Sequence, residues 1–420
     1  MQEQTQSAIV KQERERLQIR FDKYCKEGLQ LDMTRGKPGP EQLDLCDGLF
    51  GAVGPGDFKA ANGQDCRNYG GLDGLFEVKE LFAEFLGASP QEVMIGGNAS
   101  LSLMHDTVVN ALIHGVVDSL IAWSKLEKVK FLCPAPGYDR HFNICQHLGI
   151  EMVLIALNED GPDMNEVERL VAEDEAIKGI WCVPKYSNPT GIIYSDKVVG
   201  RLANMSTKAS DFRIFWDNAY AVHHLTDHRP VLKDILAACK DAGHANRVFM
   251  FGSTSKITFA GGGVSAMASS EENIAWMLKH RFMQTIGPDK LNQLRHIRYF
   301  KDVDGIHAHM KKHAAILKPK FDAVDQILKQ ELGTKGIAQW TRPLGGYFIS
   351  LDTEDGCAKR VVELAGQAGV KLTAAGAPFP YRKDPRDRNI RIAPSLPSLP
   401  AIKKATEVLA VCIQLASVEN

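Results

Sequence analysis

The stretch that decides the fold is Gly252-Ser253-Thr254-Ser255-Lys256, which follows an apolar run, Arg247-Val-Phe-Met-Phe251. The apolar run predicts a buried strand, and the loop after the lysine, Ile257-Thr-Phe-Ala-Gly-Gly-Gly263, carries little side-chain bulk. A lysine at the mouth of a buried strand is desolvated, which lowers its pKa and frees the lone pair of its amine. Such an amine can form a Schiff base with an aldehyde.

Two hydroxyl residues belong to the same turn. Ser253 and Ser255 stand at positions i and i+2 beside glycines, a pattern that suits a phosphate. An aldehyde that carries a phosphate is pyridoxal phosphate (PLP), so the stretch predicts a covalent site for that cofactor at Lys256. The alternative for the pentapeptide taken alone is a polar loop after a strand. Motifs elsewhere in the chain are needed to distinguish a cofactor site from such a loop.

Strands and helices alternate from about residue 75 to Phe251. The alternation predicts a mostly parallel sheet with helices on both faces, whose ligand lies outside the carboxyl ends of the strands. After Gly287-Pro288 a long helical segment, Val303 to Leu332, leads into short strands and helices, which predict a small α+β domain that a surface helix over 8–30 joins. The expected strands of the sheet are Glu92–Ile95, Val129–Cys133, Met152–Leu157, Gly179–Val183, Arg213–Asp217 and Arg247–Phe251.

Composition and charge exclude several classes of protein. The 420 residues predict two domains, and a net charge of -1 argues against nucleic acid or an anionic membrane as the main partner. No window reaches the ~18 consecutive apolar residues of a membrane span, and the polar segment Met1 to Arg20 is no secretory signal. Nine dispersed cysteines indicate free thiols in a reducing cytosol. No metal site is expected, since His223-His224 lacks further ligands at metal spacing.

Two motifs after predicted strands suit a heteroaromatic ring. Asp217 ends the apolar run Ile214-Phe-Trp216, and a buried carboxylate needs a cationic partner, such as a protonated pyridine nitrogen. The alternative for Asp217 is a helix N-cap. Asn188, held by the turn Ser187-Asn-Pro-Thr-Gly191, and Tyr220 can both donate to a ring oxygen. Asn-Pro-Thr-Gly as a bare turn carries no function.

Three further segments suit the remaining parts of a cofactor and substrate. Gly96-Gly97-Asn98-Ala99-Ser100 lies between a strand and a helix, where free N–H groups attract phosphate; the alternative is a glycine loop with Ser100 as N-cap. Tyr138 can lie flat on a heteroaromatic ring or be a core residue of its helix. Arg391, inside the apolar strand Asn389-Ile-Arg-Ile-Ala393, needs an anion, which is either a substrate carboxylate or a structural acid.

The ordered set of motifs resembles the fold-type I PLP-dependent enzymes, in the class I aminotransferase branch typified by aspartate aminotransferase. The motifs are Ser-Asn-Pro-Thr-Gly at 187, Asp-x-Ala-Tyr at 217, Ser-x-Ser-Lys at 253 and Ile-Arg-Ile at 390, in the family's order and approximate spacing. With Tyr69 before Gly74-Leu75, the resemblance covers residues 69–391. It implies an α/β fold whose large domain has a mostly parallel seven-stranded sheet, plus a small α+β domain. The expected division is 1–68 (N-terminal arm and part of the small domain), 69–300 and 301–420.

The resemblance also implies a role for each motif residue. Lys256 would bind PLP covalently and move the proton between the substrate Cα and the cofactor. Asp217 would pair with the pyridine nitrogen, and Arg391 would bind the substrate α-carboxylate. The ring would be held by Tyr138, Asn188 and Tyr220, and the phosphate by Asn98, Ala99, Ser100, Ser253 and Ser255.

Tyr69 matches a residue that, in the family, reaches the phosphate of the neighbouring subunit, so the resemblance implies a homodimer with shared active sites. One position departs from the family pattern. The family usually carries a phosphate-binding arginine eight residues after the lysine, and this chain has Val264 there. The charge of the phosphate must then be met by a helix dipole, hydroxyls or another basic residue.

Three segments look like a divergent bacterial subgroup, the type Ic aspartate aminotransferases, sometimes labelled MocR-like: Thr34–Pro38, Pro134–Arg140 and Thr285–Lys290. The expected reaction is therefore ping-pong transamination between L-aspartate and 2-oxoglutarate. A dicarboxylate substrate needs a second cation besides Arg391. Arg35 and Arg140 are favoured, one in an N-terminal loop that the family closes over substrate and one beside Tyr138. The full set of candidates is Arg35, Arg140, Lys185, Arg281 and Lys290.

Two other hypotheses stay open. The first keeps PLP but changes the substrate or the chemistry, to an aminotransferase for alanine, aromatic amino acids or kynurenine, or to a β-lyase; Arg391 does not discriminate, since every amino acid has an α-carboxylate. The second is a MocR-like regulator, which carries such a domain behind a winged-helix DNA-binding domain. The start of the PLP domain by about residue 35 and the neutral charge argue against a regulator. A soluble, cytoplasmic enzyme is the expectation.

Overall fold

A large mixed sheet forms the centre of the protein in the computed structural model, which describes the backbone of residues 2–420 and the side chains from residue 11 onward. Five neighbouring strands, from β8 to β4, are parallel, while β9 and β5 run antiparallel to their neighbours. The two-residue β5 makes the sheet eight-stranded, one strand more than expected. Its order is β2 (Val93–Ile95), β9 (Ser265–Ala268), β8 (Val248–Ser253), β7 (Arg213–Asp217), β6 (Ile177–Cys182), β3 (Lys130–Ala135), β4 (Glu151–Asn158) and β5 (Gly161–Pro162).

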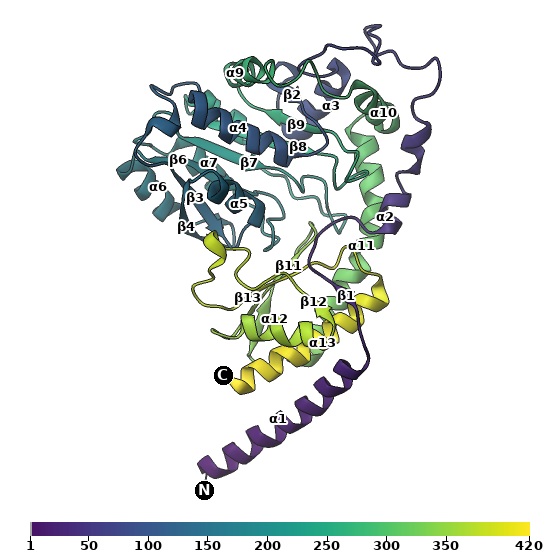
Figure 1. Ribbon diagram of the computed structural model, residues 1–420, viewed down its shortest axis with the longest axis vertical. Coiled ribbons are helices and arrows are strands. Elements are labelled where there is room, and N and C mark those ends of the chain that lie inside the picture. The colour runs from purple at the N-terminus through teal and green to yellow at the C-terminus, as the bar shows by residue number, and fades with distance from the viewer. Residues whose placement is uncertain (1) are drawn as a thin grey trace.

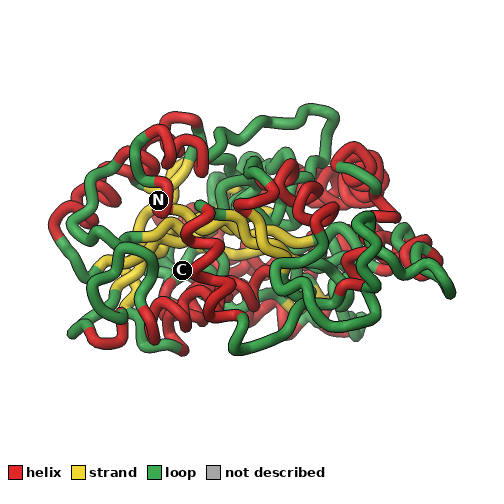
Figure 2. Tube along the Cα trace, turned by 90° about the horizontal axis from the view of Figure 1, so that it is seen from above, coloured by secondary structure: helices red, strands yellow, loops and turns green. Residues whose placement is uncertain are grey.

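Helices cover both faces of this sheet (Figure 2). The central strands are apolar on both sides, so neighbouring residues of one strand enter different cores: Ile214 and Trp216 pack on one face and Phe215 on the other. A strand that is buried on both faces is typical of α/β proteins. The helices of this part are α3 (Phe76–Leu86), α4 (Ser100–His114), α5 (Asp139–His147), α6 (Met164–Glu173), α7 (Asp196–Asn204), α8 (Ile235–Asp241), α9 (Glu271–Arg281) and α10 (Lys290–Phe300).

A three-stranded antiparallel sheet lies below the large sheet in Figure 1. It consists of β10 (Ala338–Trp340), β11 (Ile349–Thr353) and β13 (Asn389–Ile392), and it packs with α12 (Ala358–Gln367) and α13 (Leu399–Glu419).

The N-terminal segment joins this smaller body, as expected. β1 (Leu31–Asp32) pairs with β12 (Val370–Lys371), and α1 (Gln2–Lys26) lies along α13 with Leu17 and Phe21 buried (Figure 1).

One helix belongs to both bodies. α11 (Val303–Leu332) packs its first turns, around Ile306 and Met310, against Ile257 of the lysine loop. Its later turns, around Leu317 and Phe321, enter the core of the three-stranded sheet. α2 (Pro40–Asp44) lies beside it (Figure 1). The continuous helix therefore connects the turn that carries Lys256 with the smaller sheet.

The parallel strands place the sequence motifs at one edge of the large sheet. The carboxyl ends of β3, β6, β7 and β8 meet there, and the residues after them include Tyr138, Asn188 and Lys256, while Asp217 is the last residue of β7. The ligand site of an open α/β sheet lies at this edge. The described part of the chain has no helix with both the length and the apolar character that a membrane crossing requires.

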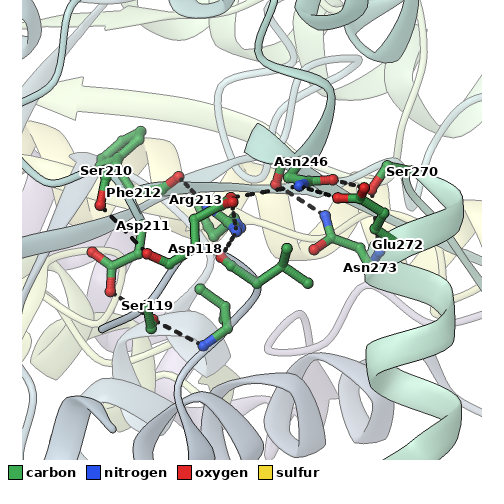
Figure 3. Close-up of polar contacts among 12 residues, drawn as sticks. Asp118, Ser119, Ser210, Asp211, Phe212, Arg213, Asn246, Ser270, Glu272 and Asn273 are labelled. Atoms are coloured by element: carbon green, nitrogen blue, oxygen red, sulfur yellow. Dashed lines mark hydrogen bonds and ion pairs between the residues drawn. The ribbon is translucent and has the colours of Figure 1, made fainter. Parts of the chain in front are cut away.

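The opposite edge, where β7 and β8 begin, carries a polar network (Figure 3). The buried Arg213 donates to Asp118 at 3.0 Å, and Asn246 connects Asp118, Glu272 and Ser270. Burial lowers the pKa of the Arg213 guanidinium to about 10. Because these groups bond one another, this edge holds the strand starts together.

Candidate active site

Lys256 lies in the turn that follows β8, and its position is fixed through its backbone. Its carbonyl oxygen accepts a hydrogen bond from Tyr347 Oη at 3.0 Å and lies 3.2 Å from His223 Nε2. Desolvation lowers the pKa of the Lys256 amine, and the charge of Asp217 opposes that shift. The Nζ atom lies 4.8 Å from the centre of the Tyr220 ring. The lowered pKa favours the neutral, nucleophilic form of the amine that a Schiff base requires.

Asp217 is buried at the end of β7, and one of its two oxygens has a hydrogen-bond partner among the residues that the structure describes. Oδ2 lies 3.1 Å from Nε2 of His141, whose ring stacks on Trp181. Oδ1 is buried without a hydrogen-bond partner among the described residues. An unpaired buried carboxylate oxygen is costly, so the site fits a cationic ring N–H that would bond to Oδ1.

The three residues predicted to hold a ring lie together around this carboxylate. Burial raises the pKa of Tyr220 well above its ordinary value, as it does for the half-buried Tyr138, so both phenols keep their protons. A phenol that keeps its proton can donate to a ring oxygen. Asn188 is buried, and its Oδ1 faces Arg391 at 3.4 Å, which leaves its NH₂ group as the donor. Tyr138 packs edge-on against His141.

The predicted phosphate residues come together between α4 and the lysine turn. Ser255 Oγ donates to the carbonyl of Asn98 at 2.7 Å, and Ser255 N donates to Ser253 Oγ at 3.4 Å. α4 begins at Ser100 with Ala99 as its N-cap, so Ser100 is not the cap that the sequence alternative proposed. The first N–H groups of an α-helix have no partner inside the helix and attract an anion.

A glycine keeps this phosphate cradle open. A Cβ added to Gly263 would lie 3.0 Å from Ser255 N and 3.1 Å from Asn98 O, both of them backbone atoms. Val264, at the position where the family carries arginine, is buried and exchanges hydrogen bonds with Thr254. The cradle therefore consists of neutral donors: hydroxyls, backbone N–H groups and a helix terminus.

Arg391 lies on β13 opposite Ser350 of β11, and its guanidinium reaches back to the large sheet. Nη1 donates to Asp139 Oδ1 at 2.9 Å, and Nη2 donates to Thr373 Oγ1 at 3.3 Å. Nε is buried without a partner among the described residues. Phe348 lies beneath the guanidinium at 5.0 Å. The cation is held in place by neighbours that leave part of its donor capacity free for a carboxylate.

The five candidates for the second cation lie in different surroundings. Arg35 and Arg140 are exposed. Arg140 follows Asp139 in the first turn of α5, and the loop of Arg35 approaches Arg391, because Thr373 donates to the carbonyl of Thr34.

The other three candidates are engaged elsewhere. Lys290 donates to the carbonyls of Asn68 and Gly70, and Arg281 to the carbonyl of Ile95. Lys185 lines a cavity with His224, Arg229 and His307, and burial lowers its pKa to about 8.

Tyr69 lies apart from the cluster on the single chain. Its side chain is 81% exposed, and Lys290 fixes the backbone on both sides of it through Asn68 and Gly70. A large aromatic side chain held out from the surface by a fixed loop is suited to contact another molecule.

The sequence analysis did not predict the hydrogen-bond partners of Asp217 and Arg391. His141 and Asp139 are both in the first turn of α5, directly after Tyr138, and Thr373 comes from the loop after β12. A signal was available for His141 and Asp139, since Tyr138 was already placed at the site and its helix brings the next residues with it. Thr373 carries no comparable signal.

Comparisons with known proteins agree with this geometry. The family model described as aspartate amino-transferase matches residues 4–420. A putative aminotransferase of Mycolicibacterium smegmatis is 55% identical over 393 residues, 93% of this chain and 92% of that protein. The aspartate aminotransferase of Corynebacterium glutamicum is 50% identical over 406 residues, 97% of this chain and 94% of that protein. A crystal structure of an aspartate transaminase from Corynebacterium glutamicum has a TM-score of 0.96 at 49% identity and covers 98% of this chain and 97% of its own.

The fold and the site define a PLP-dependent transferase of fold type I. More narrowly, the chain belongs to the aspartate aminotransferase family and is an aminotransferase. Membership of that family implies PLP as the cofactor, and the unpaired Asp217 Oδ1 and the open cradle at Gly263 fit it.

Proposed function

We propose that the chain transfers the amino group of L-aspartate to 2-oxoglutarate by a ping-pong mechanism, giving oxaloacetate and L-glutamate. The 50% identity to an aspartate aminotransferase over nearly the whole chain supports the choice of substrate. The single structural observation that carries transamination of an α-amino acid is Arg391, which is buried and whose Nε has no partner among the described residues, while the choice of aspartate rests on that identity. Arg391 faces the edge of the large sheet where Lys256 lies.

Each part of the site has a task in this reaction. PLP, when bound, supplies an aldehyde for the amine and a ring that accepts electrons from the substrate Cα. Asp217 keeps the ring nitrogen protonated through its free oxygen, and His141 orients the carboxylate through the other one. Tyr220 and Asn188 donate to the ring oxygen, while Tyr138 covers the ring.

Lys256 moves the proton. Burial lowers the pKa of its amine, which favours the neutral form, so the amine can take a proton from the substrate Cα and would return it to the C4′ atom of the cofactor. The hydrogen bond from the Tyr347 hydroxyl to the Lys256 carbonyl holds the backbone of the lysine in place while its amine moves.

The substrate carboxylates are bound at two places in the proposal. The α-carboxylate replaces or joins Asp139 on Arg391. The side-chain carboxylate binds Arg35 or Arg140, since both are exposed. Lys290 and Arg281 are instead buried and donate to backbone carbonyls.

Three further parts of the proposal concern assembly and location. The chain forms a homodimer in which Tyr69 of each subunit reaches the cofactor phosphate of the other, which explains why so large a side chain is exposed on a fixed loop. The chain divides into a small domain, built from 301–420 with the N-terminal segment 1–68, and a large domain, 69–300. The helix α11 packs against both of them. Nine free thiols support a reducing cytosol as its location.

Steady-state assays test the proposed function. The PLP-loaded enzyme is expected to prefer aspartate over alanine, phenylalanine and kynurenine as donor, with 2-oxoglutarate as acceptor. Arg140→Ala and Arg35→Ala are compared on aspartate and on alanine, because a side-chain clamp changes kcat/KM for aspartate alone. Higher kcat/KM for alanine or phenylalanine than for aspartate in the unmodified enzyme would overturn the substrate assignment.

A further inference from the structure

A second cluster of potential ligands lies behind the lysine turn. His309 and His313 stand one turn apart on α11, and Cys46 comes from the N-terminal segment between α2 and the short helix Asp47–Gly51. All three side chains are buried. They belong to neither the cofactor site nor the substrate site described above.

The ligand atoms converge on a small space. His309 Nε2 lies 3.0 Å from His313 Nε2 and 3.6 Å from Cys46 Sγ, and the three side-chain atoms all lie within 4.8 Å of one another. The carbonyl oxygen of Ile257 faces the same point, 3.0 Å from His309 Nε2 and 3.6 Å from Cys46 Sγ. Two nitrogens, one sulfur and one oxygen thus surround a common centre.

With protons alone, this arrangement depends on a weak donor. Gln42 Oε1 accepts from Gly39 N, so Gln42 Nε2 donates to His313 Nδ1 at 2.9 Å, which places the proton of a neutral His313 on Nε2. His309 Nε2 must then accept from His313 and cannot donate to the Ile257 carbonyl 3.0 Å away. The donor to that carbonyl is then the Cys46 thiol at 3.6 Å, and a thiol is a weak donor. If His309 Nε2 carried a proton instead, two N–H groups would face each other at 3.0 Å.

We propose that Cys46, His309, His313 and the carbonyl oxygen of Ile257 form a four-coordinate site for a divalent ion of borderline softness, Zn²⁺. A cation accepts the lone pairs of both imidazoles, of the thiolate and of the carbonyl at once, in place of the long S–H bond to Ile257 and the single N–H between the two rings. Cys and His ligands in tetrahedral geometry favour Zn²⁺ over harder ions such as Mg²⁺ or Ca²⁺.

The distances match such a site. Zn–S bonds of about 2.3 Å and Zn–N bonds of about 2.05 Å at tetrahedral angles place sulfur about 3.6 Å from nitrogen and two nitrogens about 3.3 Å apart. The observed separations are 3.6 and 3.0 Å. The spacing of His309 from Cys46 and from His313 is therefore close to that of a tetrahedral zinc site.

Groups that could orient the imidazole ligands are also present. Tyr299 Oη donates to the carbonyl of Leu45 at 2.7 Å and lies 3.4 Å from His309 Nδ1. Its oxygen can therefore accept a hydrogen bond from the N–H that a metal-bound imidazole keeps at Nδ1. His313 Nδ1 would donate to Gln42 if the amide turned its oxygen toward the ring. That turn gives up the bond from Gly39 N and the bond from Gln42 Nε2 to Tyr347 Oη, and metal binding has to outweigh both losses.

The proposed ion is structural. It joins three segments far apart in the sequence: the N-terminal segment at Cys46, α11, and the turn at Ile257. Because Ile257 directly follows Lys256, the ion would fix the backbone of the catalytic lysine from behind, next to the bond from Tyr347 to the Lys256 carbonyl. All four ligands are closed off from solvent, as is typical of structural zinc sites.

Metal analysis of the PLP-loaded enzyme tests the proposal. After incubation with Zn²⁺ and gel filtration, elemental analysis is expected to find one zinc per chain. Cys46→Ala and His313→Ala should each lose this zinc. Cys239→Ala, which removes an equally buried thiol from the core of the large sheet, should keep it.

A cobalt titration keeps the test independent of how well the variants fold. Co²⁺ in the unmodified holoenzyme should give the intense visible d–d bands of tetrahedral cobalt, which Zn²⁺ displaces. The proposal is overturned if unmodified enzyme keeps no zinc above background and shows only the weak octahedral cobalt spectrum. It is also overturned if Cys46→Ala retains zinc as fully as Cys239→Ala does.

Discussion

Arg391 and Asp139 form an ion pair across the two sheets, with Nη1 2.9 Å from Oδ1. Arg391 belongs to β13 of the three-stranded sheet, and Asp139 begins the helix after Tyr138 on the large sheet. The acid therefore occupies one donor of the group that must bind the substrate α-carboxylate. A substrate carboxylate meets an arginine whose charge is already partly compensated.

Replacing Asp139 by asparagine should strengthen substrate binding. The change removes a negative charge beside the carboxylate site, while Thr373 and Asn188 still position Arg391. For a partly exposed pair we expect a gain of about 1 kcal/mol, or roughly a fivefold lower KM for aspartate. Steady-state kinetics measure it, with Arg391→Ala as the opposite case, for which KM should rise at least tenfold. A raised KM in Asp139→Asn would mean that the acid orients Arg391 more than it competes with substrate.

His141 should affect the reaction rate through its hydrogen bond to Asp217. His141→Phe removes the group that holds Asp217 Oδ2, so the carboxylate loses one of its two supports. We expect kcat to fall about tenfold, in line with ~1–3 kcal/mol for the loss of a hydrogen bond to a buried charge. His141→Gln, which keeps a donor, should recover part of the rate. Equal kcat in the Phe and Gln variants would show that the hydrogen bond has no role.

Two neighbouring glycines give a matched test of the phosphate cradle. Gly263→Ala places a Cβ about 3 Å from backbone atoms of Ser255 and Asn98, whereas Gly262→Ala meets only the Phe259 Cβ at 3.8 Å. Because backbone atoms yield little, Gly263→Ala should weaken PLP binding about tenfold or more, by ~1–3 kcal/mol. Equilibrium dialysis of PLP against the apoenzyme measures the effect. Similar dissociation constants for the two variants would contradict the cradle.

The lowered pKa of Lys256 makes a prediction about pH. A depressed pKa means that the neutral amine is reached at lower pH than for an ordinary lysine, so capture of the cofactor aldehyde by apoenzyme should rise with pH and level off below 10.5. Stopped-flow absorbance with pyridoxal, which lacks the titrating phosphate, follows the reaction. Lys256→Ala should lose the absorbance and nearly all turnover. A midpoint at or above 10.5 would contradict desolvation of the amine.

The sequence predicted the positions of the central strands because their residues are apolar on both faces. Runs such as Ile214-Phe215-Trp216 can only be buried in a covered sheet, and the motifs that follow such runs share one edge. β9 was not predicted. Its sequence, Ser265-Ala-Met-Ala268, has no β-branched residue, and it becomes a strand because it pairs with β8 and β2 on either side.

The hydrogen-bond partners of Asp217 and Arg391 could not be predicted from the sequence, for a different reason. Asp217 and His141 are 76 positions apart, and Arg391 and Asp139 are 252 apart. No local periodicity encodes such pairs. Cys46 is likewise separated from His309 by 263 residues, so spacing rules for metal ligands, which rely on short intervals, could not reveal the cluster.

The contact of Arg391 with both sheets also affects how substrate preference should be measured. Any amino acid that binds through its α-carboxylate must contact Arg391, which belongs to the three-stranded sheet. It reacts at Lys256, which follows a strand of the large sheet. The free energy of aligning the two bodies is thus included in every apparent affinity. It cancels when two amino acids are compared on the same enzyme, so ratios between donors report recognition of their side chains alone.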